Sequence, residues 1–336
     1  MAKMKAVAAV KAGAPFEVVE RDVPDPGPGQ VRVKVEACGV CHSDAITRFG
    51  GYPGLKWPRI PGHEIAGRID ALGKGVSAFN AGDRVGVGWH GGHCFVCDPC
   101  RRGSFINCQQ GKVTGISHDG GYAEFAVVPA ESLARIPDGI EAVDAGPLLC
   151  AGITTYNSLR NSGVRAGDTV AVQGIGGLGH LAVQFAAKMG MRTVALSKGA
   201  DKEKLARELG ATEYTDTSAV TPAEGLQQLG GADLILATAP NSEAIAAAIG
   251  GLKPRGTLLI VAAPQEALTM SVLPLISGKR IQGWPSGSSI DAEDTMRFCA
   301  LTGIRPRIEL FPLERAEEAF GKMMANQVRF RAVLTP

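Results

Sequence analysis

Four cysteines lie close together in the segment GGHCFVCDPCRRGSFINC. Their C-x2-C-x2-C-x7-C spacing brings four thiols into one short loop, enough for the closed tetrahedral ligand set that a structural Zn²⁺ takes at about 2.3 Å. Two disulfide bonds are the alternative, but without a secretory signal ahead of the loop the spacing favours a metal. The sequence therefore predicts a structural zinc site at Cys94, Cys97, Cys100 and Cys108.

The length and charge of the chain narrow the classes of protein to consider. With 336 residues we expect two domains, each able to bury its own core. The formal net charge of +2 gives no reason to expect a nucleic-acid groove or a basic membrane-binding surface. Lys11 interrupts the first apolar run, and no apolar stretch is long enough to span a membrane. Eight cysteines without an export signal fit a reducing compartment, so we expect a cytoplasmic protein without nucleic-acid or membrane partners.

The hydrophobic pattern changes near residue 150. Before it, Val31, Val33 and Val35 alternate with polar residues, as in a half-buried strand, and further short apolar runs follow between Gly and Pro turns. After it, predicted strands alternate with predicted helices, which is typical of βαβ units and a parallel sheet. These strands are expected at 169–173, 192–196, 233–237 and 257–262, and the helices at 180–190, 201–209 and 242–249.

The last 50 residues lose this alternation and read as two helices and a final strand, FRAVLT. We therefore expect an α/β protein. Residues 1–150 and 287–336 would form a β-rich domain, and residues 151–286 a doubly wound dinucleotide-binding domain with a parallel sheet.

A glycine-rich turn, G-x-G-x-x-G, follows the first strand of the alternating part and opens the next helix. In that context the glycines allow a tight turn, a close approach of the backbone to a pyrophosphate, and close packing of helix on strand. The helix N-terminus adds free N–H groups and partial positive charge. The turn predicts a dinucleotide site at Gly174, Gly176, Gly177, Leu178 and Gly179.

The end of the second strand of this unit indicates which dinucleotide binds. A carboxylate there binds the ribose 2′-hydroxyl of NAD, whereas small and basic residues leave room for the 2′-phosphate of NADP. This chain has Ser197 and Lys198 at that place, with Lys202 further on, and its nearest carboxylate, Asp201, lies in the loop. The sequence favours NADP; NAD stays open if Lys198 is simply a solvated loop residue.

Three further residues stand in distinctive segments: Cys41 in GVCHSD, His63 in PGHE and Cys150 in LLCAGITTY. Two thiolates and one imidazole would make a three-ligand zinc site whose fourth position is open, as catalysis requires. Taken alone, the long separations are weak evidence, because a lone Cys or His is more often a packed or hydrogen-bonded residue.

Six segments together resemble the zinc-containing medium-chain dehydrogenase/reductase family, and within it the alcohol dehydrogenases, a known example of the Cys2His catalytic zinc site. The segments follow one another over nearly the whole chain, which makes the resemblance specific. They are GVCHSD at 39–44, PGHEIAG at 61–67, GDRVGVGW at 82–89, the four-cysteine loop, CAGITTY at 150–156 and GIGGLG at 174–179. The resemblance implies a GroES-like catalytic domain and a Rossmann domain, with two zinc ions per chain.

The resemblance also implies roles for single residues. Cys41, His63 and Cys150 would hold the catalytic zinc, with Glu64 able to approach the metal during ligand exchange. Asp44 would orient His63, and Ser43 would pass on the substrate proton. The remaining assignments are His42 and Arg331 beside the cofactor pyrophosphate, Thr154 and Leu178 at the nicotinamide, and Trp57 and Trp89 as walls of an apolar substrate pocket.

One position departs from the family pattern. Many members carry a histidine three residues after the relay hydroxyl, and here that residue is Ile46. The proton would then leave through the ribose hydroxyl and water, or through His42. Cys38 and Cys299 receive no role beyond buried packing, and Trp57 and Trp89 are equally compatible with ordinary core or rim positions.

The function that the resemblance implies is transfer of hydride between a primary or aromatic alcohol, or the aldehyde, and NAD(P), with NADP favoured. An NAD-dependent enzyme, or one acting on a polyol or sugar, is the close alternative. A non-catalytic zinc-stabilised nucleotide-binding protein is a remote one, which the complete set of ligands and Ser43 disfavours. The resemblance further implies a homodimer or homotetramer, and the short chain favours the tetramer.

Overall fold

The computed structural model describes residues 2–336, which form two compact units. Unit 1 comprises the chain up to Ile153 together with Gly287–Pro336, and unit 2 comprises Thr154–Ser286. No helix among the described residues is long and apolar enough to cross a bilayer.

Unit 1 is built on a seven-stranded sheet in the order β14-β15-β3-β4-β5-β7, with β6 paired to β3. All its pairings are antiparallel except that of β14 with β15. The alternation expected from Val31, Val33 and Val35 is observed, because all three side chains are buried in β3. The strands are β3 (Gln30–Gly39), β4 (Ile65–Leu72), β5 (Arg84–Val87), β6 (Phe125–Pro129), β7 (Leu133–Arg135), β14 (Ile308–Pro312) and β15 (Arg331–Thr335), beside a separate hairpin of β1 (Lys3–Ala9) and β2 (Phe16–Asp22).

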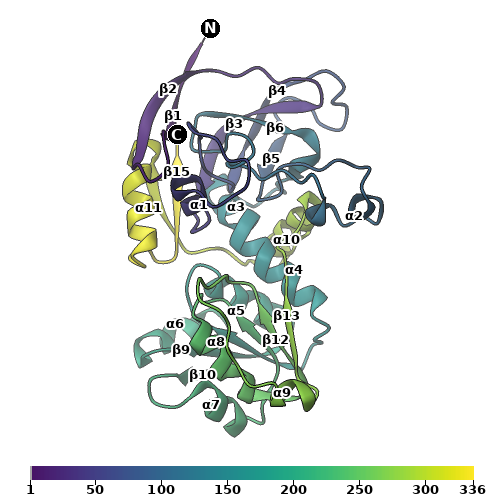
Figure 1. The fold of residues 1–336 in the computed structure, drawn as a ribbon, viewed down its shortest axis with the longest axis vertical. Coiled ribbons are helices and arrows are strands. Elements are labelled where there is room, and N and C mark those ends of the chain that lie inside the picture. Colours follow the sequence, from purple (N-terminus) through teal and green to yellow (C-terminus); the bar gives the residue numbers. More distant parts are fainter. Residues whose placement is uncertain (1) are drawn as a thin grey trace. The chain divides into compact units, whose positions relative to one another are not determined.

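The C-terminal strand of the chain joins this sheet beside a strand from its first forty residues. Strand β15, yellow in Figure 1, pairs with the end of β3, where Leu334 lies opposite Cys38 and Val333 opposite Gly39. The residues that follow β3 therefore depend on the C-terminal segment for one side of their support. The helices of unit 1 are α1 (Asp44–Phe49), α2 (Asp98–Arg101), α3 (Ala142–Pro147), α10 (Ser289–Thr302) and α11 (Ala316–Met324).

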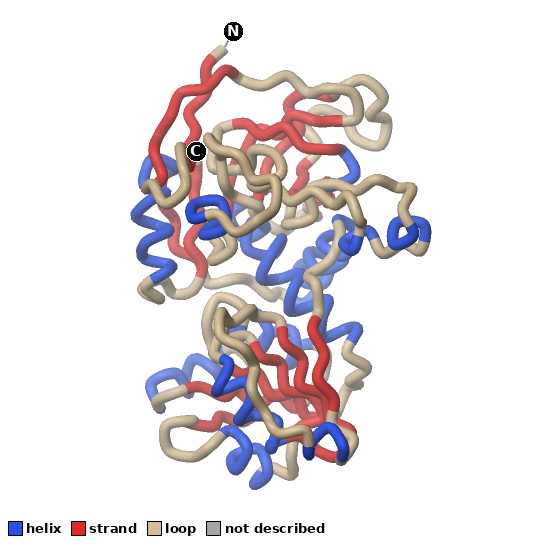
Figure 2. The backbone as a smooth tube through the Cα atoms, in the orientation of Figure 1, coloured by secondary structure: helices blue, strands red, loops and turns tan. Residues whose placement is uncertain are grey.

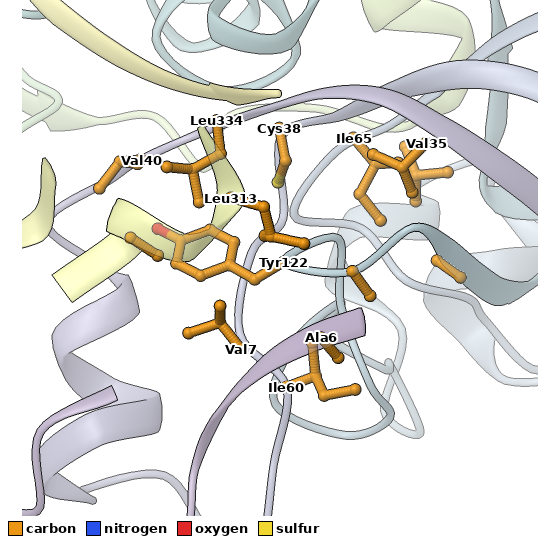
Figure 3. Close-up of a cluster of buried hydrophobic side chains, with 14 of the residues drawn as sticks. Ala6, Val7, Val35, Cys38, Val40, Ile60, Ile65, Tyr122, Leu313 and Leu334 are labelled. Carbon is orange, nitrogen blue, oxygen red and sulfur yellow. The ribbon is translucent and has the colours of Figure 1, made fainter. Parts of the chain in front are cut away.

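The core of unit 1 surrounds Tyr122, whose side chain is fully buried. Figure 3 shows its ring among Val7, Leu313 and Leu334, which come from β1, the C-terminal segment and β15. Phe16 meets the same ring edge-on at 6.0 Å between centroids. This apolar packing fixes the position of the Tyr122 hydroxyl, which lies next to the site described below.

Unit 2 holds a six-stranded parallel sheet in the order β10-β9-β8-β11-β12-β13. The first strand, β8, lies in the middle and the chain winds outward in both directions, which is the doubly wound arrangement. Figure 2 shows helices flanking these strands. The strands are β8 (Thr169–Gln173), β9 (Arg192–Ser197), β10 (Glu213–Asp216), β11 (Ala232–Ala237), β12 (Leu252–Ile260) and β13 (Arg280–Gly283). The helices are α4 (Ile153–Asn161), which begins at the last residue of unit 1, α5 (Gly179–Lys188), α6 (Glu203–Glu208), α7 (Pro222–Gln228), α8 (Ser242–Ala248) and α9 (Leu273–Ile276).

The predicted α/β fold class is confirmed, and so are the strands expected around 169–173, 192–196 and 233–237. Strand β12 begins at Leu252, five residues before the predicted start at 257, because the sheet extends the pairing through a register shift beside Ala232. Among the strands and α-helices of unit 2, five were not predicted: β10, β13, α4, α7 and α9. Each has at most nine residues, too few for a clear periodic pattern.

Candidate functional site

The four-cysteine loop brings its sulfur atoms together. The Sγ atoms of Cys94 and Cys100 lie 4.0 Å apart and those of Cys97 and Cys108 lie 3.8 Å apart. A tetrahedron with Zn–S bonds of about 2.3 Å has edges of about 3.8 Å, so this spacing fits zinc. All four sulfurs lie within 4.8 Å of one another.

Backbone N–H groups in the loop donate to its sulfur atoms and favour the thiolate form of Cys94 and Cys97, whereas burial raises the pKa of Cys100 to about 12. The amide of Cys94 donates to Sγ of Cys108 at 3.3 Å, as does the amide of Gln110. Backbone N–H groups of Cys100 and Gln109 lower the pKa of the Cys97 thiol to about 6. The loop is thus arranged as a closed four-sulfur cage with no residue left for substrate.

A second group of ligand atoms forms inside unit 1, from Cys41, His63, Glu64 and Cys150, again within 4.8 Å of one another. The Sγ atoms of Cys41 and Cys150 are 3.8 Å apart, and this contact is the largest cause that lowers the pKa of Cys41. Nε2 of His63 is buried and has no hydrogen-bond partner in the described chain. An orphaned imidazole nitrogen beside two thiols fits a metal ion, since a buried polar atom otherwise finds a partner.

Asp44 fixes the orientation of this histidine. Its Oδ1 lies 3.3 Å from Nδ1 of His63, while its Oδ2 accepts from the backbone of Cys41 at 2.8 Å and from the Tyr122 hydroxyl at 2.9 Å. Asp44 is 1% exposed, so these contacts replace water entirely. A carboxylate on one ring nitrogen leaves the other available to a metal, which is the usual outer support of a zinc-bound histidine. Tyr122 was not among the predicted site residues.

Glu64 and Arg331 form a buried ion pair beside the thiols, through Oε1 of the glutamate and a terminal guanidinium nitrogen. Burial raises the pKa of Glu64 to about 7, although Arg331 opposes that shift. The other oxygen, Oε2, has no partner in the described chain and occupies space above Gly39, where a Cβ would lie 1.8 Å from it. Glu64 therefore has one oxygen anchored and one uncommitted. Arg331 lies against Glu64, and its predicted role at a pyrophosphate stays a prediction.

Cys150 lies in an unusual turn. Residues Leu148–Gly152 form a π-helical turn between α3 and α4. Such turns are rare and concentrate at functional sites, because the extra residue per turn re-aims a side chain. The segment LLCAG carries no sequence signal for this geometry.

Ser43, His42 and Ile46 lie at or near the start of α1. Ser43 is the residue before the helix, but its side chain makes no capping bond to it, so the hydroxyl is not committed to the backbone there. His42 is exposed, and Ile46 is half-buried on the first turn. The predicted relay residue and the apolar residue that departs from the family pattern therefore lie at the start of the same short helix.

The two tryptophans differ in their surroundings. Trp89 packs edge-on against the His63 ring at 5.2 Å between centroids, so it borders the second metal group directly. Trp57 donates from Nε1 to the carbonyl of Thr47 at 2.8 Å and packs near Gly50 at the end of α1. Trp89 therefore contacts a proposed ligand, whereas Trp57 contacts the end of the helix.

In unit 2 the glycine turn joins β8 to α5 as predicted. Gly174 has φ +90°, a conformation that L side chains rarely adopt. A Cβ on Gly179 would lie 1.8 Å from the Gly174 carbonyl oxygen, so this glycine allows helix and strand to pack closely. A Cβ on Gly176 would meet nothing within 4 Å. The open space beside Gly176, at the start of a ten-residue helix, fits a pyrophosphate.

The remaining predicted cofactor residues also lie in unit 2. Ser197 is the buried last residue of β9, Lys198 is exposed, and Lys202 is half-buried in the 3-10 turn before α6. Leu178 lies in the glycine turn, and Thr154, in the first turn of α4, donates to Ser286 Oγ at 3.2 Å. No carboxylate side chain stands at the end of β9 itself.

Two family models match this chain. An alcohol dehydrogenase GroES-like domain matches residues 27–138, and a zinc-binding dehydrogenase domain matches residues 177–300. The chain is also 46% identical over 324 residues to alcohol dehydrogenase notN of Aspergillus sp. (strain MF297-2), which spans 96% of this chain and 95% of that protein.

Solved structures of alcohol dehydrogenases are also similar to this chain. A crystal structure of an NAD-dependent alcohol dehydrogenase superposes with a TM-score of 0.92 at 28% identity, covering 99% of this chain and 100% of the other. The structure of CAD from Helicobacter pylori complexed with NADP(H) superposes with a TM-score of 0.86, also at 28% identity, covering 99% and 98%. The similar structures thus include proteins described with either dinucleotide.

Proposed function

The chain belongs to the zinc-binding alcohol dehydrogenases of the medium-chain dehydrogenase/reductase family, and we propose that it interconverts primary or aromatic alcohols and aldehydes with zinc and NADP. The observation that carries this proposal is the convergence of Cys41, His63 and Cys150 around an orphaned Nε2 nitrogen. In this proposal unit 1 carries the alcohol chemistry and unit 2 binds the dinucleotide.

Two zinc ions per chain are proposed. Cys94, Cys97, Cys100 and Cys108 would hold a structural ion, and Cys41, His63 and Cys150 a catalytic one. When bound at the three-ligand site, zinc supplies Lewis acidity to the oxygen of the substrate. Asp44 would hold His63 in the tautomer that offers Nε2, and the Trp89 ring packs edge-on against the imidazole.

Ser43 would accept the alcohol proton at Oγ during oxidation and return it during aldehyde reduction. The absence of a capping bond leaves this hydroxyl available for that role. Ile46 cannot accept the proton. The proton would therefore leave through a ribose hydroxyl and water, or through His42, which is exposed to solvent. When bound, the dinucleotide supplies the nicotinamide carbon that takes up the hydride.

NADP is proposed over NAD because β9 ends in Ser197 and Lys198 without a carboxylate side chain. An acid at this place would accept a bond from the ribose 2′-hydroxyl, whereas an ammonium group attracts a 2′-phosphate. The aromatic walls proposed for the pocket, Trp57 and Trp89, favour apolar or aromatic alcohols over polyols.

The test is to measure initial rates for a panel of small primary alcohols, benzyl alcohol and polyols, each with NAD and with NADP. The panel is repeated after a chelator treatment and after zinc is added back. We expect oxidation of the primary and aromatic alcohols, a larger kcat/KM with NADP, loss of rate on chelation and recovery with zinc.

Each alternative has its own result in the same experiment. Faster rates with NAD keep the enzyme class and overturn the proposed cofactor. A preference for sorbitol-type polyols overturns the proposed substrate class. The absence of any chelator-sensitive rate with every alcohol and aldehyde supports the non-catalytic alternative.

A further inference from the structure

We infer that Tyr214 and Asp216, on the neighbouring strand β10, are specificity-determining positioning residues that hold the Ser197–Gly199 turn in the shape that receives the 2′-phosphate of NADP. The inference rests on the proposed NADP preference and goes beyond it, since neither residue lies on the strand that ends in Ser197. Both act through the turn rather than by touching the substrate.

The pairing of the strands brings these residues to the turn. Strands β9 and β10 run parallel, with Asp216 opposite Ser197 and Tyr214 opposite Ala195. Because Tyr214 and Asp216 are two positions apart, their side chains leave the same face of the sheet. Both therefore reach the turn that follows β9 at its carboxyl end, where α/β sheets of this type bind dinucleotides.

Gly199 is held by its backbone on both sides. Its N–H donates to Oδ1 of Asp216 at 2.8 Å, and its carbonyl oxygen accepts from the Tyr214 hydroxyl at 2.5 Å. The carbonyl oxygen of Ser197 lies 3.4 Å from the same hydroxyl and accepts from the backbone of Thr217 at 2.9 Å. The residue between them, Lys198, is exposed and is carried by a turn fixed at both ends.

The conformation of Gly199 explains why the turn needs this support. Gly199 has φ +80°, and a Cβ there would lie 2.6 Å from Oδ1 of Asp201. A glycine in this region of φ is flexible in the absence of bonds to its backbone, since many other conformations are open to it. The two side chains of β10 therefore select one conformation, and with it one direction for Lys198.

The hydrogen bonds of Asp216 are consistent with this role. Besides the Gly199 N–H, Oδ1 of Asp216 accepts from the Ser218 amide at 2.9 Å and from the Ser218 hydroxyl at 2.6 Å. With three donors, this oxygen is committed to the turn. The same acid that could favour NAD is thereby used to build the site for NADP.

The test measures equilibrium binding of NADP+ and NAD+ to the full chain by isothermal titration calorimetry, so that it does not depend on turnover. The two dinucleotides differ only in the 2′-phosphate, so the ratio of their Kd values isolates the contribution of the turn. The variants are Tyr214→Phe, Asp216→Ala, Asp216→Asn and Lys198→Ala. Thr212→Val is the matched control, because Thr212 also donates a hydroxyl to β9, at the carbonyl of Thr193 3.0 Å away, but at the opposite end of the strand.

We expect Tyr214→Phe and Asp216→Ala to weaken NADP+ binding about fivefold to tenfold, the usual effect of losing one hydrogen bond, because each variant loses one bond to the Gly199 backbone; NAD+ binding should change less than about twofold. Asp216→Asn keeps an acceptor oxygen and should retain most of the preference. Thr212→Val should leave both the ratio of the two Kd values and kcat with saturating NADP unchanged.

The outcomes separate this inference from the proposed function. If Lys198→Ala lowers the NADP+ preference but Tyr214→Phe and Asp216→Ala do not, the positioning role is wrong and the cofactor proposal stands. If Asp216→Ala and Asp216→Asn both tighten NADP+ binding, Asp216 acts as a repelling charge, which also overturns the inference. A wild-type protein that binds NAD+ more tightly than NADP+ overturns the cofactor proposal itself.

Discussion

Oδ1 of Asp44 lies 3.3 Å from Nδ1 of His63, while Oδ2 of the same carboxylate accepts from Cys41 N–H and the Tyr122 hydroxyl. One buried side chain thus connects a proposed imidazole ligand, the backbone of a proposed thiolate ligand and the core of unit 1. Because Oδ2 already serves two donors, only Oδ1 is left to face the histidine.

We predict that Asp44→Asn lowers the affinity of the three-ligand site for zinc by about 10- to 100-fold. In this variant the amide oxygen takes the place of Oδ2, so the NH2 group faces Nδ1 of His63. Nδ1 must then accept a hydrogen bond, and the imidazole carries its proton on Nε2. A protonated Nε2 cannot bind a metal. Competition with a chromophoric chelator measures this affinity. Asp70→Asn, at a surface ion pair with Arg32, is the control and should not change it.

Ser43→Ala should reduce kcat by about 10²- to 10⁴-fold, the usual contribution of a positioned proton-transfer group. Zinc content and dinucleotide binding should remain at wild-type levels, because the hydroxyl makes no capping bond to α1. Ser43→Thr keeps the hydroxyl and should restore most of the rate. Near-normal turnover in the alanine variant would show that the proton leaves by another path.

Loss of a ligand in the four-cysteine loop should affect stability more than chemistry. In Cys100→Ser we expect the zinc content to fall from two ions per chain to one, and the Tm to fall by at least about 5 °C, since structural zinc contributes folding free energy. The rate per remaining zinc ion should change little. Cys299→Ser is the control for zinc content and should keep both ions, since Cys299 lies outside both ligand groups. An unchanged Tm after loss of one ion would contradict a structural role.

Substitution of alanine for glycine should affect the stability of the protein at one position of the β8–α5 turn but not at another. Gly179→Ala places a Cβ 1.8 Å from the Gly174 carbonyl oxygen and should lower the free energy of unfolding by about 1–3 kcal/mol. Gly176→Ala meets nothing within 4 Å, so its stability should stay within about 0.5 kcal/mol of the wild type.

In Gly176→Ala the added methyl group would occupy the proposed pyrophosphate space. We expect binding of NADP+ and NAD+ to weaken equally, by at least about tenfold, as backbone bonds to the phosphates are lost. Denaturant titration and calorimetry on the two variants check both results. A Gly176→Ala protein with normal dinucleotide affinity would show that the pyrophosphate does not lie there.

The parts of the fold that the sequence predicts well are those with a local signal. Strand β8 and helix α5 follow from a buried apolar run and a glycine turn, and the four-cysteine loop follows from spacing alone. The set of Cys41, His63 and Cys150 was accessible only through the family resemblance, because nothing in their separations shows that they meet.

Other features depend on contacts between distant residues and leave no pattern in the sequence. Tyr122 reaches Asp44 from 78 positions away, and only the packing of unit 1 determines where its hydroxyl lies. The π-helical turn at Cys150 and the bonds from Tyr214 and Asp216 to Gly199 belong to the same class. Strand β10 itself has four residues at the edge of its sheet, where alternation is too short to read.

Because strand β15 pairs with the end of β3, the order of synthesis bears on when the protein becomes active. All seven proposed cysteine and histidine ligands have left the ribosome by the time Cys150 emerges, yet Arg331 and β15 follow only after the whole of unit 2. A growing chain can therefore complete the parallel sheet of unit 2 while Glu64 still lacks its counter-ion and the sheet of unit 1 lacks two strands. Activity is then expected to begin only after β15 has been synthesised.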